Sequence, residues 1–292
     1  MEEEKERGIR MLPHPRPVKA GHAVVIGPPA GLFRIGVGAL WEYRELLYFL
    51  VWRDLKLRYK QTVIGLGWVV LQPLATMVIF SVVFGRLARV PSEGLPYPVF
   101  VYTALLPWNY FATALNRCVL SVVGEAHLIS KIYFPRLLLP LAAPISGLVD
   151  FAVAFVLLLG LIAWYHLTLS AAILTVPLFL LVALLTALAV GLWLSALNVR
   201  YRDVGYTIPL LIQVWLFASP VVYPLRLVPA PYRLLYSLNP MVGVVEGFRW
   251  ALLGTAPPAL GVLAVSFAAV TLLLLGGLIF FRRLEDQFAD VV

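Results

Sequence analysis

The chain has 292 residues, of which 61% are hydrophobic and only 13% are charged, and its mean hydropathy is +0.90. These values exclude an ordinary soluble domain, and repeated apolar runs of about 20 residues predict an all-α polytopic membrane protein. The formal net charge of +8 lies at the ends of the apolar segments, where it suits topology and anionic lipid head groups but forms no basic groove for nucleic acid.

Residues 1–40 are rich in Pro and Gly and lack the sustained apolar stretch and cleavage site of a signal peptide. We therefore expect a flexible cytoplasmic tail. Residues 41–60 have a helical period that predicts an amphipathic helix lying in the membrane interface. The alternative is that this segment is only the charged start of the first span. The apolar face would hold Tyr48, Val51, Trp52, Leu55 and Tyr59, and the cationic face Arg53, Lys56 and Lys60.

Six transmembrane helices are predicted after this segment, because lipid offers no hydrogen-bond partners and each span must close its own backbone bonds. The predicted spans are 66–85, 99–120, 137–164, 172–197, 206–223 and 258–281. Pro140, Pro144 and Pro209 are expected to kink them. Alternate connections hold 18 and 5 of the 23 Lys and Arg residues. The positive-inside rule therefore places both termini, including the tail 286–292, in the cytoplasm.

The outer connection 224–255 is long and largely apolar, so we do not expect a free loop. It contains two stretches with a helical pattern, and both are too short to span comfortably. Asn239 followed by Pro240 is a good helix start, and Gly254 is a plausible stop. The sequence predicts two short re-entrant helices here, which are tolerated only where protein or water covers irregular backbone.

Ionisable residues are almost absent from the predicted spans, which argues against catalysis inside the membrane. Asp150 is the acid that lies well inside an apolar run. It either hydrogen-bonds a neighbouring helix or takes part in a transport path. His127 and His166 have no partners spaced for a metal site, and Cys118 is the only cysteine. We predict no catalytic residue, no metal and no cofactor in this chain.

The chain lacks the glycine-rich phosphate-binding loop that ends in Gly-Lys-Ser/Thr. If ATP drives the protein, a different polypeptide hydrolyses it. The connection between spans two and three carries a helical apolar set, Leu128, Ile129 and Ile132. This set either contacts a soluble partner at the membrane surface or merely extends the second span.

Several aromatic side chains lie where they can face either a passage or packed helices and lipid. In a passage, flat rings offer weak contacts to the C–H faces of sugars. The channel candidates are Trp68, Phe80, Phe84, Trp108, Tyr110, Trp215, Phe217 and Tyr223.

Six motifs occur in order along residues 41–281, beginning with RDLKLRYKQTVIGLGWVVLQPL and YPVFVYTALLPWNYF at the first two spans. LISKIYFPRLLLPLAAPISGLVDF follows at the third span and NVRYRDV after the fourth. SPVVYP ends the fifth span, and LNPM lies in the outer connection. This pattern resembles the polysaccharide and polyol-phosphate export permeases of the type-two ABC transporters, which include O-antigen exporters of lipopolysaccharide biosynthesis and teichoic acid exporters.

The resemblance implies a transmembrane domain over residues 41–285 that forms a homodimeric channel in the bacterial inner membrane. Two ATP-binding subunits, which hold ATP and Mg²⁺, would pair with it. Residues 41–60 would be the interface helix, spans one and five would line the passage, and 224–255 would be an outer gate. The resemblance also implies a coupling helix that contacts the ATPase through Glu125, His127, Leu128, Ile129, Lys131, Ile132, Tyr133 and Phe134.

The expected substrate is a lipid-linked polysaccharide. Its carrier phosphate would meet cationic side chains at the inner surface, with Arg53, Lys56, Arg58 and Lys60 as the candidates. One rival is a membrane-embedded glycosyl or phosphoglycosyl transferase, for which Glu125, Asp203 and Glu246 are too scattered to form a catalytic pair. The other rival is an exporter of drugs or small lipids from the same superfamily.

Overall fold

The computed structural model describes residues 41–60, 67–285 and 287–288. The tail predicted for 1–40 lies outside these ranges, as does most of 286–292. Every regular element in the described ranges is helical. In chain order they are α2 (Arg44–Lys60), α3 (Gly67–Phe80), the π-helical η1 (Ser81–Leu87), α4 (Tyr97–Gly124), α5 (Ala126–Ile129), α6 (Leu138–Trp164), η2 (Ala171–Thr175), α7 (Val176–Arg200), α8 (Asp203–Phe217), η3 (Leu225–Leu227), η4 (Ala230–Tyr232), α9 (Arg233–Tyr236), α10 (Pro240–Leu253) and α11 (Leu260–Glu285).

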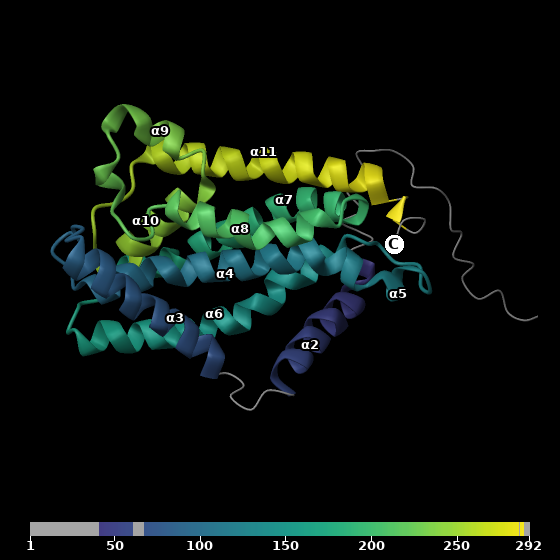
Figure 1. Ribbon diagram of the computed structural model, residues 1–292, viewed down its shortest axis with the longest axis horizontal. Helices are drawn as coiled ribbons and strands as arrows, with labels where there is room; N and C mark the ends of the chain where they lie inside the picture. The colour runs from purple at the N-terminus through teal and green to yellow at the C-terminus, as the bar shows by residue number, and fades with distance from the viewer. Residues whose placement is uncertain (1–40, 61–66, 286, 289–292) are drawn as a thin grey trace, which may run out of the picture. The chain divides into compact units, whose positions relative to one another are not determined.

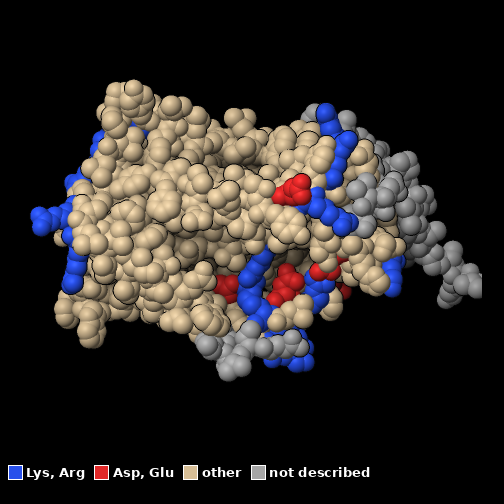
Figure 2. Space-filling model, viewed as in Figure 1, with Lys and Arg blue, Asp and Glu red and all other residues tan. Residues whose placement is uncertain are grey.

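Four helical stretches are long and apolar enough to cross a membrane: Gly67–Leu87, Leu138–Trp164, Ala171–Arg200 and Leu260–Glu285. The all-α class predicted from the sequence is therefore confirmed in the described part of the chain. In the view of Figure 2, a broad band without charge separates Lys and Arg side chains at its two ends. A band of this kind is what a hydrocarbon core requires of the protein surface.

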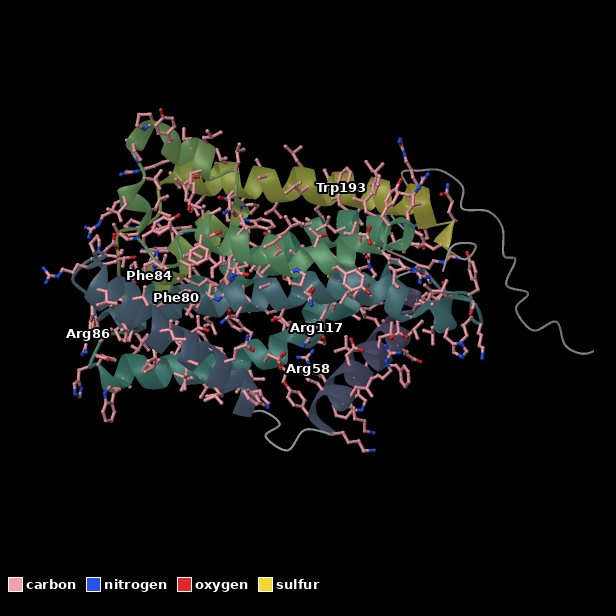
Figure 3. All side chains as sticks on the ribbon, in the orientation of Figure 1. Arg58, Phe80, Phe84, Arg86, Arg117 and Trp193 are labelled. Atoms are coloured by element: carbon pink, nitrogen blue, oxygen red, sulfur yellow. The ribbon has the colours of Figure 1, made fainter. Side chains whose placement is uncertain are left out.

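Helix α4 forms the centre of the core. It packs against α6, α7 and α10, and α7 packs in turn against α11 (Figure 1). Side chains of α4 such as Phe100, Tyr102 and Phe111 are fully buried. Trp193 of α7 (Figure 3) stacks on Phe280 of α11 with ring centroids 4.7 Å apart. Extensive packing therefore fixes the positions of these helices. In lipid, van der Waals contacts between helices take the place of the hydrophobic effect.

The approach of α4 and α7 depends on a glycine. A Cβ atom added at Gly191 would lie 2.5 Å from the Cβ of Cys118, which is fixed to the α4 backbone. Only separation of the two helices relieves such a contact. We predict that Gly191→Ala lowers the free energy of unfolding by about 1 to 3 kcal/mol, the usual cost of overpacking.

Gly160→Ala is the matched control, because nothing lies within 4 Å of a Cβ at that helical position. It should leave stability unchanged or raise it slightly. Unfolding in mixed detergent micelles measures both variants, and equal stabilities would contradict the close-contact argument.

The segment between α8 and α11 is held by side chains of two predicted motifs. Helix α10 begins at Pro240 and ends before Gly254, which adopts φ 66°, as the sequence predicts. Asn239 caps it by accepting from the Met241 N–H at 3.1 Å, and its amide group donates to Ser219 Oγ at 2.8 Å. LNPM and SPVVYP therefore form one hydrogen-bonded unit.

Arg249 of α10 reinforces this unit from inside the protein. Its guanidinium donates to Val221 O at 2.7 Å and Tyr223 O at 3.2 Å, and it pairs with Glu246 at 3.1 Å. Its Cζ atom lies 3.7 Å from the centroid of the Phe100 ring, and its side chain is only 1% exposed. The residue thus fixes the backbone after α8 against the central helix.

Candidate functional site

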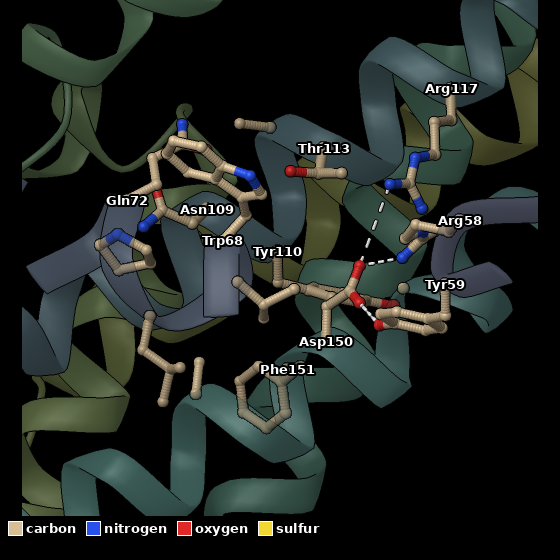
Figure 4. Close-up of a pocket in the computed structure, with 16 residues that line it drawn as sticks. Arg58, Tyr59, Trp68, Gln72, Asn109, Tyr110, Thr113, Arg117, Asp150 and Phe151 are labelled. Carbon is tan, nitrogen blue, oxygen red and sulfur yellow. Dashed lines mark hydrogen bonds and ion pairs between the residues drawn. The ribbon is translucent and has the colours of Figure 1, made fainter. Parts of the chain in front are cut away.

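A cavity of about 340 Å³ lies between α2, α3, α4 and α6 (Figure 4). Helix α4 contributes Asn109, Thr113 and Arg117, which recur at every fourth position and so fall on one helical face. A polar stripe on an otherwise apolar helix needs a partner or a ligand, because polar groups in the membrane region carry a desolvation cost. This stripe directs attention to the cavity as a binding site.

One end of the cavity is charged. Asp150 of α6 accepts hydrogen bonds from Arg58 and from the Tyr59 hydroxyl, both at the end of α2, and Arg117 Nη2 lies 3.9 Å from Asp150 Oδ2. Burial, together with the hydrogen bond to Asp150, raises the pKa of Tyr59 to about 12, so its phenol stays protonated and donates. Figure 3 shows Arg58 and Arg117 close to each other between α2 and α4.

The other end of the cavity is polar but uncharged. Its polar groups come from Trp68, Gln72 and Asn109, and Thr113 lies between these side chains and the arginines (Figure 4). Apolar side chains, among them Val69, Pro73 and Leu106, also line the cavity. Tyr110 borders the cavity and donates to Pro144 O at 2.9 Å, which ties α4 to α6. Amide and hydroxyl groups beside an indole ring can bind a sugar, and two guanidinium groups can bind a phosphate.

The four cations predicted to meet a phosphate are not brought together. Arg58 lines the cavity, whereas Lys56 and Lys60 are exposed on α2. Arg53 points to a different acid: it pairs with Glu125, and Arg53 Nη1 lies 2.9 Å from Glu125 Oε2. Burial lowers the pKa of Arg53, but the hydrogen bonds and charges of Glu125 and Asp54 raise it above its ordinary value. A phosphate role for these residues stays a prediction, with the strongest geometry at Arg58.

The predicted coupling segment contains exposed and buried side chains. Lys131, Ile132 and Tyr133 are exposed, as is His127. Leu128 is partly buried, and Ile129 and Phe134 are buried in a cluster with Phe281 and Phe288 near the end of α11. Three consecutive exposed side chains at 131–133 are therefore the part that can touch a soluble partner.

The turn after this segment is fastened to the last helix. The Arg136 N–H donates to Glu285 Oε1 at 2.9 Å, and the Arg136 guanidinium donates to the Glu285 carbonyl. Glu125, at the beginning of the segment, is bonded to Arg53 of α2. The segment thus has a strong polar contact at each end, to two different helices.

The aromatic candidates fall into different environments. Trp68 and Phe217 are about half exposed, whereas Trp108 and Tyr110 are buried in the core. Phe80 and Phe84 contact each other edge to face, at the end of α3 and η1 that is remote from Arg58 and Arg117 (Figure 3).

The remaining two aromatic candidates are hydrogen-bonded within the chain. Trp215 donates to Asn239 Oδ1 at 2.9 Å, and the Tyr223 hydroxyl lies 2.6 Å from that of Tyr236. Contacts with neighbouring side chains therefore account for most members of the set, and Trp68 and Tyr110 are the two that line the cavity.

In the sequence, Arg117 is only one of the 18 Lys and Arg residues assigned to the cytoplasmic side, and its place in the cavity is not apparent there. The spacing of Asn109, Thr113 and Arg117 is the signal that could have revealed it. Asp150 is held by the neighbouring helix α2, as one of its two predicted roles requires, and it also lines the cavity. Among the described residues, no group of three His, Cys, Asp or Glu could hold a metal ion.

Comparisons with known proteins extend over nearly the whole chain. Residues 45–253 match the family described as ABC-2 type transporter. The chain is 30% identical over 260 residues to the O-antigen export system permease protein RfbA of Myxococcus xanthus, covering 88% of this chain and 98% of that protein. It is 25% identical to a protein of the same name from Klebsiella pneumoniae, covering 85% of this chain and 95% of that protein. It is 27% identical to the polysialic acid transport protein KpsM of Escherichia coli, covering 80% of this chain and 91% of that protein.

Proposed function

Because the chain belongs to the ABC-2 type transporter family, we propose that it is the permease that forms the channel of a bacterial exporter for a lipid-linked polysaccharide such as an O-antigen. The observation that carries the substrate class is the match along 98% of an O-antigen export permease. The polysialic acid transporter among the relatives supports a polysaccharide but leaves its repeat unit open. Sequence identities of 25–30% do not identify the particular sugar that this chain exports.

The chain is a multi-pass membrane subunit without catalytic activity of its own, as membership of this family establishes. The family therefore decides against the transferase alternative. Energy for transport comes from an ATPase partner. We propose that the partner is present in two copies and holds the ATP and Mg²⁺ of the complex.

The proposed topology has six spans, and both termini lie on the cytoplasmic side of the inner membrane. The first span is α3 together with η1, and the others are α4, α6, α7, α8 and α11. Helix α4 supports this count because its 28 residues extend about 42 Å, more than a hydrocarbon core requires. The shorter α8 has 15 residues, and the backbone that follows it, covered by Arg249 and Asn239, would complete the crossing.

The proposed assembly is a homodimer whose passage is lined by the first and fifth spans. Helices α3 and α8 support this arrangement, because each buries only one side chain, Met77 and Ile208 respectively, and exposes several apolar ones in the single chain. Examples are Val78 and Ile79 on α3 and Leu210 and Val214 on α8. Residues 224–255 would form the gate at the outer end.

We propose that the ATPase docks on the exposed side chains at 131–133, between the two polar attachments of the coupling segment. The double change Lys131→Ala and Tyr133→Ala should reduce ATP-dependent export several-fold, because it removes a cation and an aromatic anchor of the kind that dominates interfaces. Co-purification of the ATPase with the permease measures the contact directly.

The matched control removes the exposed Arg86 and Trp164, a cation and an aromatic side chain outside the coupling segment. Export that falls equally in both double variants, or unchanged export in the first, would count against the docking assignment.

Reconstitution tests the function itself. The permease and its ATPase, placed in proteoliposomes, should move a lipid-linked polysaccharide across the bilayer only when ATP is supplied. Transport of a small lipid or a drug in place of the glycan would favour the other exporter class. An equal rate from the permease without the ATPase would overturn the proposal.

A further inference from the structure

The charged end of the cavity has two cationic side chains, Arg58 and Arg117, and one carboxylate, Asp150. Asp150 pairs with Arg58 and lies 3.9 Å from Arg117. The three side chains carry a net charge of +1. Arg117 Nη1 is buried and has no hydrogen-bond partner among the described residues. The second acid near α2, Glu125, is already bonded to Arg53. Arg117 Nη1 therefore has unused capacity to donate a hydrogen bond to an anion.

We propose that this cavity binds the phosphoryl group and first sugar of a glycolipid, and that Asp150 occupies the two arginines until the phosphate replaces it. The proposal rests on the proposed function, which supplies the substrate class. A phosphate carries more negative charge and more acceptor oxygens than the carboxylate of Asp150, so it can offer each arginine a bidentate pair of hydrogen bonds. Tyr59 continues to donate to Asp150 when the arginines turn to the phosphate.

The uncharged end completes the site. Gln72 and Asn109 offer both donors and acceptors, Thr113 adds a hydroxyl, and the half-exposed Trp68 supplies a flat apolar surface. These groups recognise a neutral, hydroxyl-rich ring. They lie next to the arginines (Figure 4), just as the sugar lies next to the phosphate in a sugar phosphate.

The size of the cavity limits what it can hold. Its volume of about 340 Å³ is at the lower end of the range of roughly 300 to 1,000 Å³ found for small-molecule sites. A head group fits this space, but a polymer does not. The cavity is therefore a recognition site for the lipid-linked end and is distinct from the passage of the glycan.

Binding to the full permease and ATPase complex, in nanodiscs of phosphatidylcholine, tests the proposal. The main probe is a short polyprenyl diphosphate that carries one N-acetylhexosamine. Arg117→Gln should weaken its binding at least about tenfold, the factor that corresponds to one lost charge-assisted hydrogen bond. Asp150→Asn should tighten binding several-fold, because it removes the competing anion. Arg86→Gln is the control and should have no effect, because Arg86 lies far from the cavity (Figure 3).

The opposite signs separate binding from a structural role. If the cluster only stabilises the fold, Arg117→Gln and Asp150→Asn weaken binding together, and the proposal fails. Each variant is compared with the original by its melting temperature, and Arg117→Lys, which keeps the charge, should restore part of the affinity. Thr113→Val, at an exposed position, should weaken binding of the sugar-bearing probe and leave the sugar-free diphosphate lipid unaffected.

Two further probes identify the source of the phosphate. Phosphatidylglycerol that binds as tightly as the main probe would mean a general anionic-lipid site, and inorganic diphosphate that does so would mean a simple anion site. Either result overturns the glycolipid assignment. Unchanged binding by Arg117→Gln in a complex that exports glycan removes this site alone, whereas absence of export by the unaltered complex removes the proposed function.

Discussion

Replacing Arg249 with methionine is expected to lower the free energy of unfolding by about 3 to 5 kcal/mol and to abolish export. The guanidinium is 1% exposed and serves two backbone carbonyls and Glu246. Methionine fills much of the volume but leaves the two carbonyls without this donor and the partly buried Glu246 without its cation, and breaking a buried ion pair by removing one partner costs this much. Unfolding in mixed micelles and export in proteoliposomes are the measurements.

Two controls make the Arg249 prediction specific. Arg226→Met removes a cation from the same outer segment, but its ion pair with Glu93 is exposed, so the change should cost less than about 1 kcal/mol. Adding Glu246→Gln to Arg249→Met removes the stranded charge and should recover part of the stability. If Arg226→Met proves as costly as Arg249→Met, burial is not the cause.

Arg53→Gln and Glu125→Gln are each expected to reduce export by roughly 10- to 100-fold while ATP hydrolysis continues. The two side chains share two hydrogen bonds across α2 and the beginning of the coupling segment. Charge-assisted bonds of this kind contribute about 1.5 to 3 kcal/mol each. Their loss would let the segment move without moving α2. Export and ATPase rates measured on the same proteoliposomes detect this uncoupling.

The double variant distinguishes a shared contact from two separate roles. If Arg53 and Glu125 act on each other, changing both should reduce export no further than one change does. If Arg53 meets a carrier phosphate and Glu125 meets the ATPase, as the sequence predicted, the two losses should multiply. Glu45→Gln, exposed on the same helix, is the control and should have little effect.

Much of the fold is readable from the sequence, because length and hydropathy define apolar helices almost without tertiary information. The start of α10 was also predictable, since Asn239 and Pro240 form a local helix signal. The packing of α2 was only partly predictable. Its periodicity predicts an apolar face that includes Tyr48 and Trp52, which are exposed, whereas Leu50 is the residue buried on the bundle. A helix between protein and lipid has two apolar surfaces, and periodicity alone does not say which surface meets which neighbour.

The candidate site was less predictable, because its residues come from helices far apart in the sequence. Arg58 was selected for its charge, and Asp150 for its place in an apolar run. Nothing in the sequence pairs them, since the ion pair joins residues 92 positions apart. Glu125 shows the same limit: the family resemblance marks it as a docking residue, but only the fold reveals that Arg53 already engages it.

Arg136 bonds one end of the predicted coupling segment to Glu285 of α11, and Glu125 bonds its other end to α2. In the proposed transporter, a force applied by the ATPase to residues 131–133 would therefore divide between the first described helix and the last. Helices α2 and α11 would therefore move together when the ATPase changes conformation, instead of one helix moving alone.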